Sequence, residues 1–164
     1  MMLPSSVRKA RPADVPAIAE LVNGYADERV MLPRTPEDVM LALDDYVVAV
    51  DGRGRVLGCG ALREYSPSVA EVASIAVARE AQGQGVGRSV VARVEELARV
   101  RGYADVFLVT VTPGFFESLG YVRVGRASYP EKRCPHEVSM ASCAECEKVC
   151  MWRPVSTGAL EQAA

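Results

Sequence analysis

The chain has 164 residues, of which 49% are hydrophobic, which is enough for one domain with a substantial core. Its net charge of −2 at pH 7, with arginines scattered rather than clustered, argues against nucleic acid as a main partner. No apolar run approaches a membrane span and residues 1–9 lack the apolar core of a signal peptide, so we expect a cytoplasmic protein without a membrane partner.

The first part of the chain predicts a strand followed by two helices. Residues 7–10 are a short strand candidate, and Asp14 can cap the helix that comes next. Apolar residues at helical spacing mark the inward face of that helix: Ile18, Leu21, Val22 and Tyr25. Thr35 before Pro36 is a second helix start signal.

Three strands then form a predicted meander. Residues 46–50 read as a buried strand, 51–54 as a hairpin turn and 56–64 as the returning strand, which its glycines make slim. Residues 69–77 are the third strand. Strict alternation divides that strand between two faces, with Glu71, Ala73, Ile75 and Val77 on one and Val72, Ser74 and Ala76 on the other.

A glycine-rich run, Gln-Gly-Gln-Gly-Val-Gly-Arg-Ser at residues 82–89, joins the third strand to an amphipathic helix predicted over 86–101. Glycine lets backbone amides approach an anion closely, and the first helical turn adds unpaired N–H groups and a positive dipole end. The run therefore predicts a pyrophosphate cradle. A P-loop is excluded because no Gly-Lys-Ser/Thr follows, and Val90 in place of a third glycine fits the dinucleotide fingerprint poorly.

The remaining elements complete an α/β (α+β) order. Residues 105–111 predict a central strand, 112–120 a short helix and 121–124 a further strand. Residues 149–155 predict a final strand, with Trp152 at the sheet edge or at a subunit contact. This order fits a mixed sheet covered by helices on both faces.

Gln82-x-x-Gly85-x-Gly87, together with this order of elements, resembles the GNAT family of N-acetyltransferases. The resemblance covers residues 7–124 and implies a mixed, mostly antiparallel central sheet and acetyl-CoA as cofactor. It assigns cofactor binding to the loop and to residues on either side of it: Ile75, Ala76, Val77, Gln82, Gly83, Gln84, Gly85, Val86, Gly87, Arg88, Ser89, Phe115 and Phe116. We treat 1–155 as one such domain and 156–164 as a flexible tail.

The resemblance also proposes the catalytic groups. Glu71, upstream of the cofactor contacts, is the first choice for the base, against the alternative of a solvated strand-end carboxylate. Glu64, Tyr65 and His136 are weaker candidates. Many members have a tyrosine acid where this chain has Phe116, so we expect protonation by water or no side-chain acid.

Several segments further resemble stand-alone amino-acid N-acetyltransferases of the N-acetylglutamate synthase type, namely the Phe115-Phe116 pair, Gly58-Cys59-Gly60-Ala61-Leu62 and Ala70-Glu71-Val72. That resemblance implies L-glutamate as acceptor, a place in arginine biosynthesis and a homodimer. An arginine common near Ala73 is missing here, which leaves Arg29, Arg34 and Arg63 as carboxylate partners. Two alternatives remain open: a family member acting on a polyamine, antibiotic or protein N-terminus, and a non-catalytic acyl-CoA-binding or metal-sensing module.

A cysteine-rich segment at 130–150 forms the last candidate site. Four cysteines, of which two have the Cys-x-x-Cys spacing of metal ligands, could close a tetrahedral zinc site: Cys134, Cys143, Cys146 and Cys150. Unbound thiols and disulfides are the alternatives, and a cytoplasmic location favours the thiols.

Overall fold

The computed structural model describes residues 6–28, 30–130 and 148–156. Its helices and strands are, in chain order, β1 (Ser6–Lys9), α1 (Val15–Asp27), α2 (Pro36–Leu41), β2 (Tyr46–Val50), β3 (Val56–Ser66), β4 (Val69–Val77), α3 (Val86–Val100), β5 (Asp105–Thr110), α4 (Pro113–Glu117), β6 (Val122–Val124) and β7 (Val149–Pro154). Short 3-10 turns, η1 to η4, lie at Pro12–Asp14, Leu43–Asp45, Arg79–Ala81 and Arg126–Ser128. No helix in these ranges is long and apolar enough to cross a membrane.

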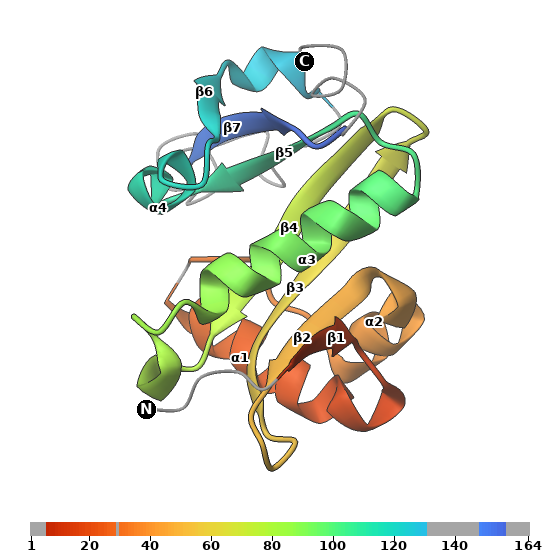
Figure 1. Cartoon of the computed structure of the whole chain (residues 1–164), viewed down its shortest axis with the longest axis vertical. Coiled ribbons are helices and arrows are strands. Elements are labelled where there is room, and N and C mark those ends of the chain that lie inside the picture. Colours follow the sequence, from red (N-terminus) through yellow and green to blue (C-terminus); the bar gives the residue numbers. More distant parts are fainter. Residues whose placement is uncertain (1–5, 29, 131–147, 157–164) are drawn as a thin grey trace.

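The described strands form one sheet of seven in the order β1-β2-β3-β4-β5-β7-β6 (Figure 1). Neighbours are antiparallel except β4 and β5, which run parallel, so the predicted mixed and mostly antiparallel sheet is confirmed. Of the two places predicted for Trp152, the sheet edge was wrong, while the subunit contact stays a prediction. Trp152 lies on β7, inside the sheet, paired with Phe107 on one side and Val122 on the other.

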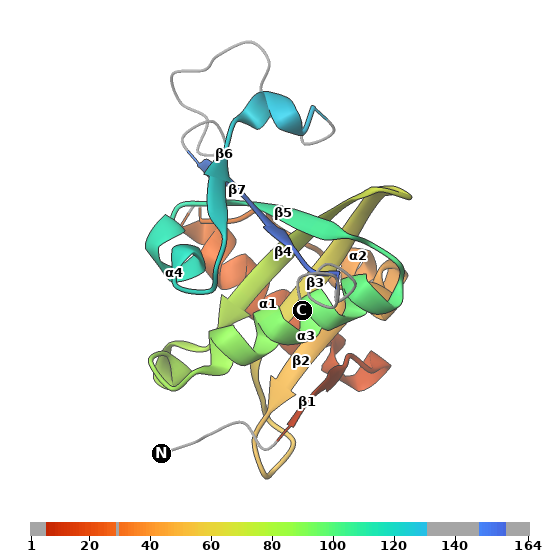
Figure 2. The same ribbon diagram turned by 45° about the horizontal axis from the view of Figure 1, so that its top comes forward.

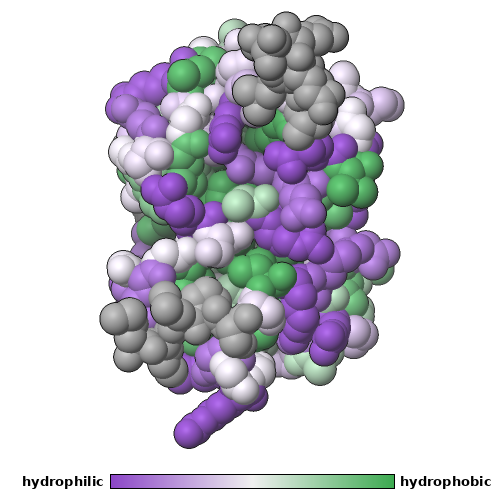
Figure 3. All heavy atoms as spheres, viewed as in Figure 1, coloured by the Kyte–Doolittle hydropathy of each residue, from purple (hydrophilic) through white to green (hydrophobic). Residues whose placement is uncertain are grey.

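Helices cover both faces of the sheet, as the two ribbon views agree (Figures 1 and 2). One core cluster unites α1 and α2 with the face of the sheet that carries Val48, Cys59 and Ala76. The other unites α3 and α4 with the face that carries Leu62 and Leu108. On the surface seen in Figure 3, apolar side chains are dispersed among hydrophilic ones.

Glycines in β3 explain how closely α3 packs on the sheet. A Cβ at Gly60 would lie 2.6 Å from Cδ1 of Ile75 and 2.7 Å from Cγ1 of Val90, and one at Gly58 would lie 2.9 Å from Cγ1 of Val86. No side chain fits at those distances, because real Cβ atoms stay farther from their neighbours. The glycines of β3, which the sequence predicted to make the strand slim, therefore allow α3 to pack closely on the sheet.

The helix caps follow the sequence signals in one case and depart from them in the other. Thr35 accepts a hydrogen bond from the Asp38 amide at 3.1 Å and caps α2 as predicted. Asp14 makes no side-chain cap to α1. The chain first makes the turn η1, and the Asp14 carboxylate accepts from the Arg11 amide and pairs with Arg8, both at 2.7 Å.

A β-bulge interrupts β4 and changes the predicted faces. Cys59 is opposite Ala76 and Ala61 is opposite Ala73, so Ser74 and Ile75 together face Gly60. Ser74 has φ of +54°, an uncommon conformation for a residue with a side chain. Beyond the bulge the alternation is inverted. Val72 thus shares the α3 face with Ile75 and Val77, rather than lying opposite them as strict alternation predicted.

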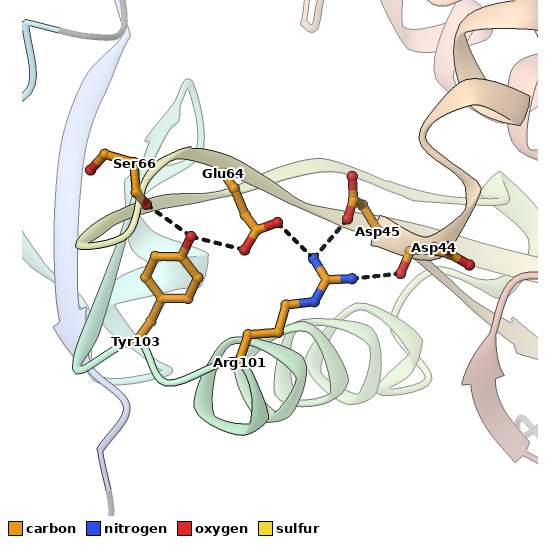
Figure 4. A network of polar contacts seen from close by, with 6 residues as sticks. All are labelled: Asp44, Asp45, Glu64, Ser66, Arg101 and Tyr103. Carbon is orange, nitrogen blue, oxygen red and sulfur yellow. Dashed lines mark hydrogen bonds and ion pairs between the residues drawn. The ribbon is translucent and has the colours of Figure 1, made fainter.

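A polar cluster at the far end of α3 ties the helix to the first strands (Figure 4). The Arg101 guanidinium donates to Asp45 Oδ1 at 2.7 Å, to Glu64 Oε2 at 3.2 Å and to the Asp44 carbonyl at 2.9 Å. The Tyr103 hydroxyl lies 2.9 Å from Glu64 Oε1. Burial and the Glu64 carboxylate raise the pKa of Tyr103 to about 12, so it remains a hydrogen-bond donor. Glu64, a weaker base candidate, is thus part of this structural cluster.

Candidate active site

A cavity of about 660 Å³ opens where β4 and β5 diverge. The two parallel strands are in register at Glu71 and Phe107. Beyond that pair they separate, and residues from both strands line the opening. The glycine loop closes one end of the cavity, and residues of the segment after α1 (Val30, Met31, Leu32 and Arg34) form a further wall.

The glycine loop presents backbone amides to this cavity. Gly83 and Gly85 have φ of +76° and +82°, which side chains disfavour, and Gly85 is the N-cap of α3. The first intrahelical hydrogen bond runs from the Ser89 amide to the Gly85 carbonyl at 3.1 Å. The amides of Val86, Gly87 and Arg88 precede it, so no carbonyl of the helix receives them. A doubly charged diphosphate fits such a helix end.

Most of the residues predicted to bind the cofactor line the cavity: Ile75, Val77, Gln82, Gly83, Gly85, Val86, Gly87, Arg88, Phe115 and Phe116. Gly87 packs closely in this cradle, where a Cβ would lie 3.2 Å from the Phe115 ring, a tight contact. Three predicted residues, Ala76, Gln84 and Ser89, do not line it. Ala76 packs in the core beneath α1, while the Ser89 hydroxyl donates to the Gly85 carbonyl at 3.0 Å.

Gln84 does not line the cavity, and one of its side-chain polar atoms is unsatisfied. Its side-chain nitrogen donates to the Glu80 carbonyl at 3.3 Å. Its Oε1 is buried and has no hydrogen-bond partner among the described residues. Such an atom is costly in a finished fold, and a donor from a bound molecule would satisfy it.

Tyr25 is a cavity residue that the sequence pattern assigned to the core. Its hydroxyl donates to the Val77 carbonyl at 2.6 Å and accepts from the side-chain nitrogen Nε2 of Gln82. The Arg79 guanidinium lies 5.3 Å from the centre of its ring. Tyr25 thereby links α1 to the end of β4 and to the first residue of the loop. The helical spacing of Tyr25 gave no sign of this, because the link joins segments more than fifty residues apart.

Glu71 lies at the closed end of the opening, and it is 2% exposed. It is therefore not a solvated strand-end carboxylate. The Tyr65 hydroxyl donates to Glu71 Oε1 at 3.2 Å, and Arg63 faces Glu71 across the β3–β4 pair. Burial, reinforced by the Glu71 charge, raises the pKa of Tyr65 to about 12. Tyr65 is thus a protonated donor at neutral pH.

Guanidinium groups also line this cavity. Arg34 and Arg63 both line it, and Lys148 joins them from the start of the last strand segment. The Asn23 side chain on α1 holds the backbone of Arg34 at two points, donating to its carbonyl at 2.7 Å and accepting from its amide at 2.9 Å. Arg29, the remaining predicted carboxylate partner, lies outside the described residues.

Phe116 leaves no acid at the position where the resemblance in sequence led us to look for a tyrosine. Its ring packs edge-on against Tyr121, with 5.6 Å between ring centres, in the core beside α3. Hydroxyl groups are nevertheless present on this wall. Thr110 and Thr112 line the cavity, and the Thr112 amide donates to Thr110 Oγ1 at 2.9 Å.

The zinc hypothesis rests largely outside the described residues, where Cys134, His136, Cys143 and Cys146 lie. Cys150 is described, as a buried residue on β7 whose thiol pKa is raised by that burial. Within the described ranges no group of His, Cys, Asp and Glu side chains could hold a metal ion.

Comparison with known proteins adds to this geometry. The model of the acetyltransferase (GNAT) family matches residues 17–122. An uncharacterized N-acetyltransferase of Chlorobaculum tepidum is 34% identical over 88% of this chain and 93% of its own. An amino-acid acetyltransferase of Mycobacterium tuberculosis is also 34% identical, over 72% of this chain and 68% of its own. The crystal structure of a Mycobacterium tuberculosis protein in complex with CoA superposes with a TM-score of 0.79 at 27% identity, covering 91% of this chain and 98% of that one.

Proposed function

The chain belongs to the GNAT acetyltransferase family, and from that premise we propose that it transfers the acetyl group of acetyl-CoA to the α-amine of an amino acid, with L-glutamate as the first candidate. One observation carries the proposal. A single cavity is lined by the glycine loop at the start of α3, by a buried carboxylate, Glu71, and by the cations Arg34 and Arg63. The loop suits a diphosphate, and the carboxylate with the cations suits a zwitterion.

In this proposal, different residues bind the cofactor and accept the proton of the amine. The amides of the glycine loop hold the diphosphate, while Ile75 and Val77 on the open side of β4 guide the pantetheine arm. Bound acetyl-CoA supplies the activated acyl group. Glu71 takes the proton of the amine, directly or through one water, and Tyr65 holds its carboxylate in place.

Recognition of the acceptor falls to the cationic wall. Guanidinium groups bind carboxylates with two parallel hydrogen bonds, so Arg34 and Arg63 suit an acceptor that carries acidic groups near its amine. The name of the Mycobacterium tuberculosis relative, an amino-acid acetyltransferase, supports the same substrate class.

An acceptor screen tests the proposal. Purified protein is incubated with acetyl-CoA and a panel of amines, and CoA release is followed. We expect turnover with amino acids and the highest kcat/KM with glutamate. The matched pair glutamate and glutamine measures what the side-chain carboxylate contributes. Higher kcat/KM for polyamines, aminoglycosides or peptide N-termini would contradict the amino-acid assignment.

A further inference from the structure

The open side of β4 presents backbone carbonyls to the cavity. The Ala78 amide donates to a carbonyl of β3 at 2.8 Å. A trans peptide points its C=O and its N–H to opposite sides, so the Val77 carbonyl points away from β3. Ala76 is paired with Cys59 two residues earlier in the same register, which turns the Ile75 carbonyl the same way. Ile75 and Val77 both line the cavity.

One of these two carbonyls is already occupied. The Tyr25 hydroxyl, which comes from α1, donates to the Val77 carbonyl at 2.6 Å. Two further contacts hold Tyr25 in this place, because the Gln82 side chain donates to the same hydroxyl and the Arg79 guanidinium lies 5.3 Å from the centre of the ring. Tyr25 itself lines the cavity, so its phenol stands where a ligand would approach Val77. The Ile75 carbonyl is not covered in this way.

The choice between the two carbonyls decides where the thioester lies. Under the proposed function, on which this inference rests, the pantetheine arm runs from the glycine loop along this edge toward Glu71. The arm has two amides and is flexible, so a bound diphosphate does not by itself decide which carbonyl an amide meets. The carbonyls of Ile75 and Val77 are two residues apart, roughly 7 Å along a strand. An arm that paired at Val77 would stop the thioester that far short of Glu71.

We propose that Tyr25 is a positioning residue for the cofactor, whose hydroxyl occupies the Val77 carbonyl and thereby restricts the arm to the productive pairing at Ile75. Tyr25 takes no part in bond making or proton transfer. It acts through the backbone of β4, by removing an acceptor that would hold the arm in the wrong place. The benefit is in the rate of the bound complex, because reacting groups must be held in a near-attack geometry.

Tyr25→Phe tests this, because it keeps the ring and removes only the hydroxyl. The variant uncovers the Val77 carbonyl and so adds an unproductive way for the arm to bind. One extra hydrogen bond of ordinary strength should make CoA bind about 5-fold more tightly in calorimetric titration, which needs no acceptor. The unproductive complexes hold enzyme idle, so kcat and the KM for acetyl-CoA should both fall by that factor while kcat/KM stays as in the wild type.

Tyr103→Phe is the matched control. Its hydroxyl also lies 2.9 Å from a backbone carbonyl, that of Ser66, but it belongs to the cluster at the far end of α3 and does not line the cavity. This variant should keep the wild-type CoA affinity, kcat and KM.

Wild-type CoA affinity in Tyr25→Phe would overturn the proposal and leave the proposed function standing. Weaker CoA binding, or a KM for acetyl-CoA that rises, would also overturn it, because the hydroxyl would then only fasten α1 to the strand and the loop. If the wild-type protein binds no CoA, the proposed function fails as well.

Discussion

At the scale of single residues, Gly85 and Gly54 form a natural pair. Both have a left-handed backbone, with φ of +82° and +80°, and in both a Cβ would meet nothing within 4 Å. They differ in position, because Gly85 begins α3 at the cavity and Gly54 lies in the turn between β2 and β3. The same substitution at each therefore separates backbone strain from ligand binding.

We predict that Gly85→Glu abolishes acetyl-CoA binding, because it places a negative charge where a diphosphate is held. Gly54→Glu carries the same backbone cost, about 1–2 kcal/mol, and should bind acetyl-CoA normally. Calorimetric titration of both variants, with thermal unfolding for stability, makes the comparison. Unchanged affinity in Gly85→Glu would remove the loop from the binding site.

A second residue-scale prediction concerns Glu71 and its donor. Glu71→Gln should lower kcat by about 10²-fold or more while acetyl-CoA affinity stays as in the wild type. Tyr65→Phe deletes the protonated donor to the Glu71 carboxylate. Because that hydrogen bond holds the carboxylate in place, its loss should lower kcat by a smaller factor than Glu71→Gln does, with acetyl-CoA affinity unchanged. A wild-type kcat in Tyr65→Phe would show that Tyr65 does not act on the base.

At the scale of elements, α1 connects two walls of the site. Tyr25 fastens its last turns to β4 and the glycine loop, and Asn23 fastens them to the segment that carries Arg34. Neither contact was predictable from helical periodicity, because each pairs a helix residue with backbone brought near only by folding. The glycine loop and α3 were predictable, since their signals lie within one short stretch of sequence.

Asn23→Ala should therefore affect the acceptor and not the donor. Without the two hydrogen bonds the Arg34 backbone is no longer fixed, so KM for the amino acid should rise by about 10-fold. Acetyl-CoA affinity should be unchanged. Asn23→Asp keeps an acceptor for the Arg34 amide but places an oxygen against the Arg34 carbonyl. Its KM for the amino acid should therefore lie, at best, midway between those of the wild type and Asn23→Ala. A rise in KM for acetyl-CoA instead would place Asn23 on the cofactor side.

At the scale of the whole molecule, the cluster in Figure 4 bears on stability. Arg101→Met keeps the apolar stem and removes the contacts to Asp45, Glu64 and the Asp44 carbonyl. We expect a loss of ~1–2 kcal/mol, discounted because the partners are partly exposed. Arg93→Met on the same helix is the control, since its pair with Glu96 is 3.7 Å long and should contribute little. Thermal unfolding of both variants decides, and equal melting temperatures would contradict the assignment.

Sequence reasoning reached the layered architecture but missed where the sheet departs from regularity. Continuous apolar runs and glycine turns predicted the strands and their order. The bulge at Ser74 and the place of β7 depend on pairing between distant segments, which no local pattern encodes. The homodimer, the zinc site and the cytoplasmic location stay predictions.

The position of β7 has a consequence for synthesis of the chain. Both of its neighbours, β5 and β6, are translated earlier, and β7 pairs between them. Until residues 149–154 leave the ribosome, each of those strands keeps an open edge on the side that β7 will fill. The nascent polypeptide must therefore carry two unmet hydrogen-bonding edges until residues 149–154 have emerged, an interval in which chaperone protection matters.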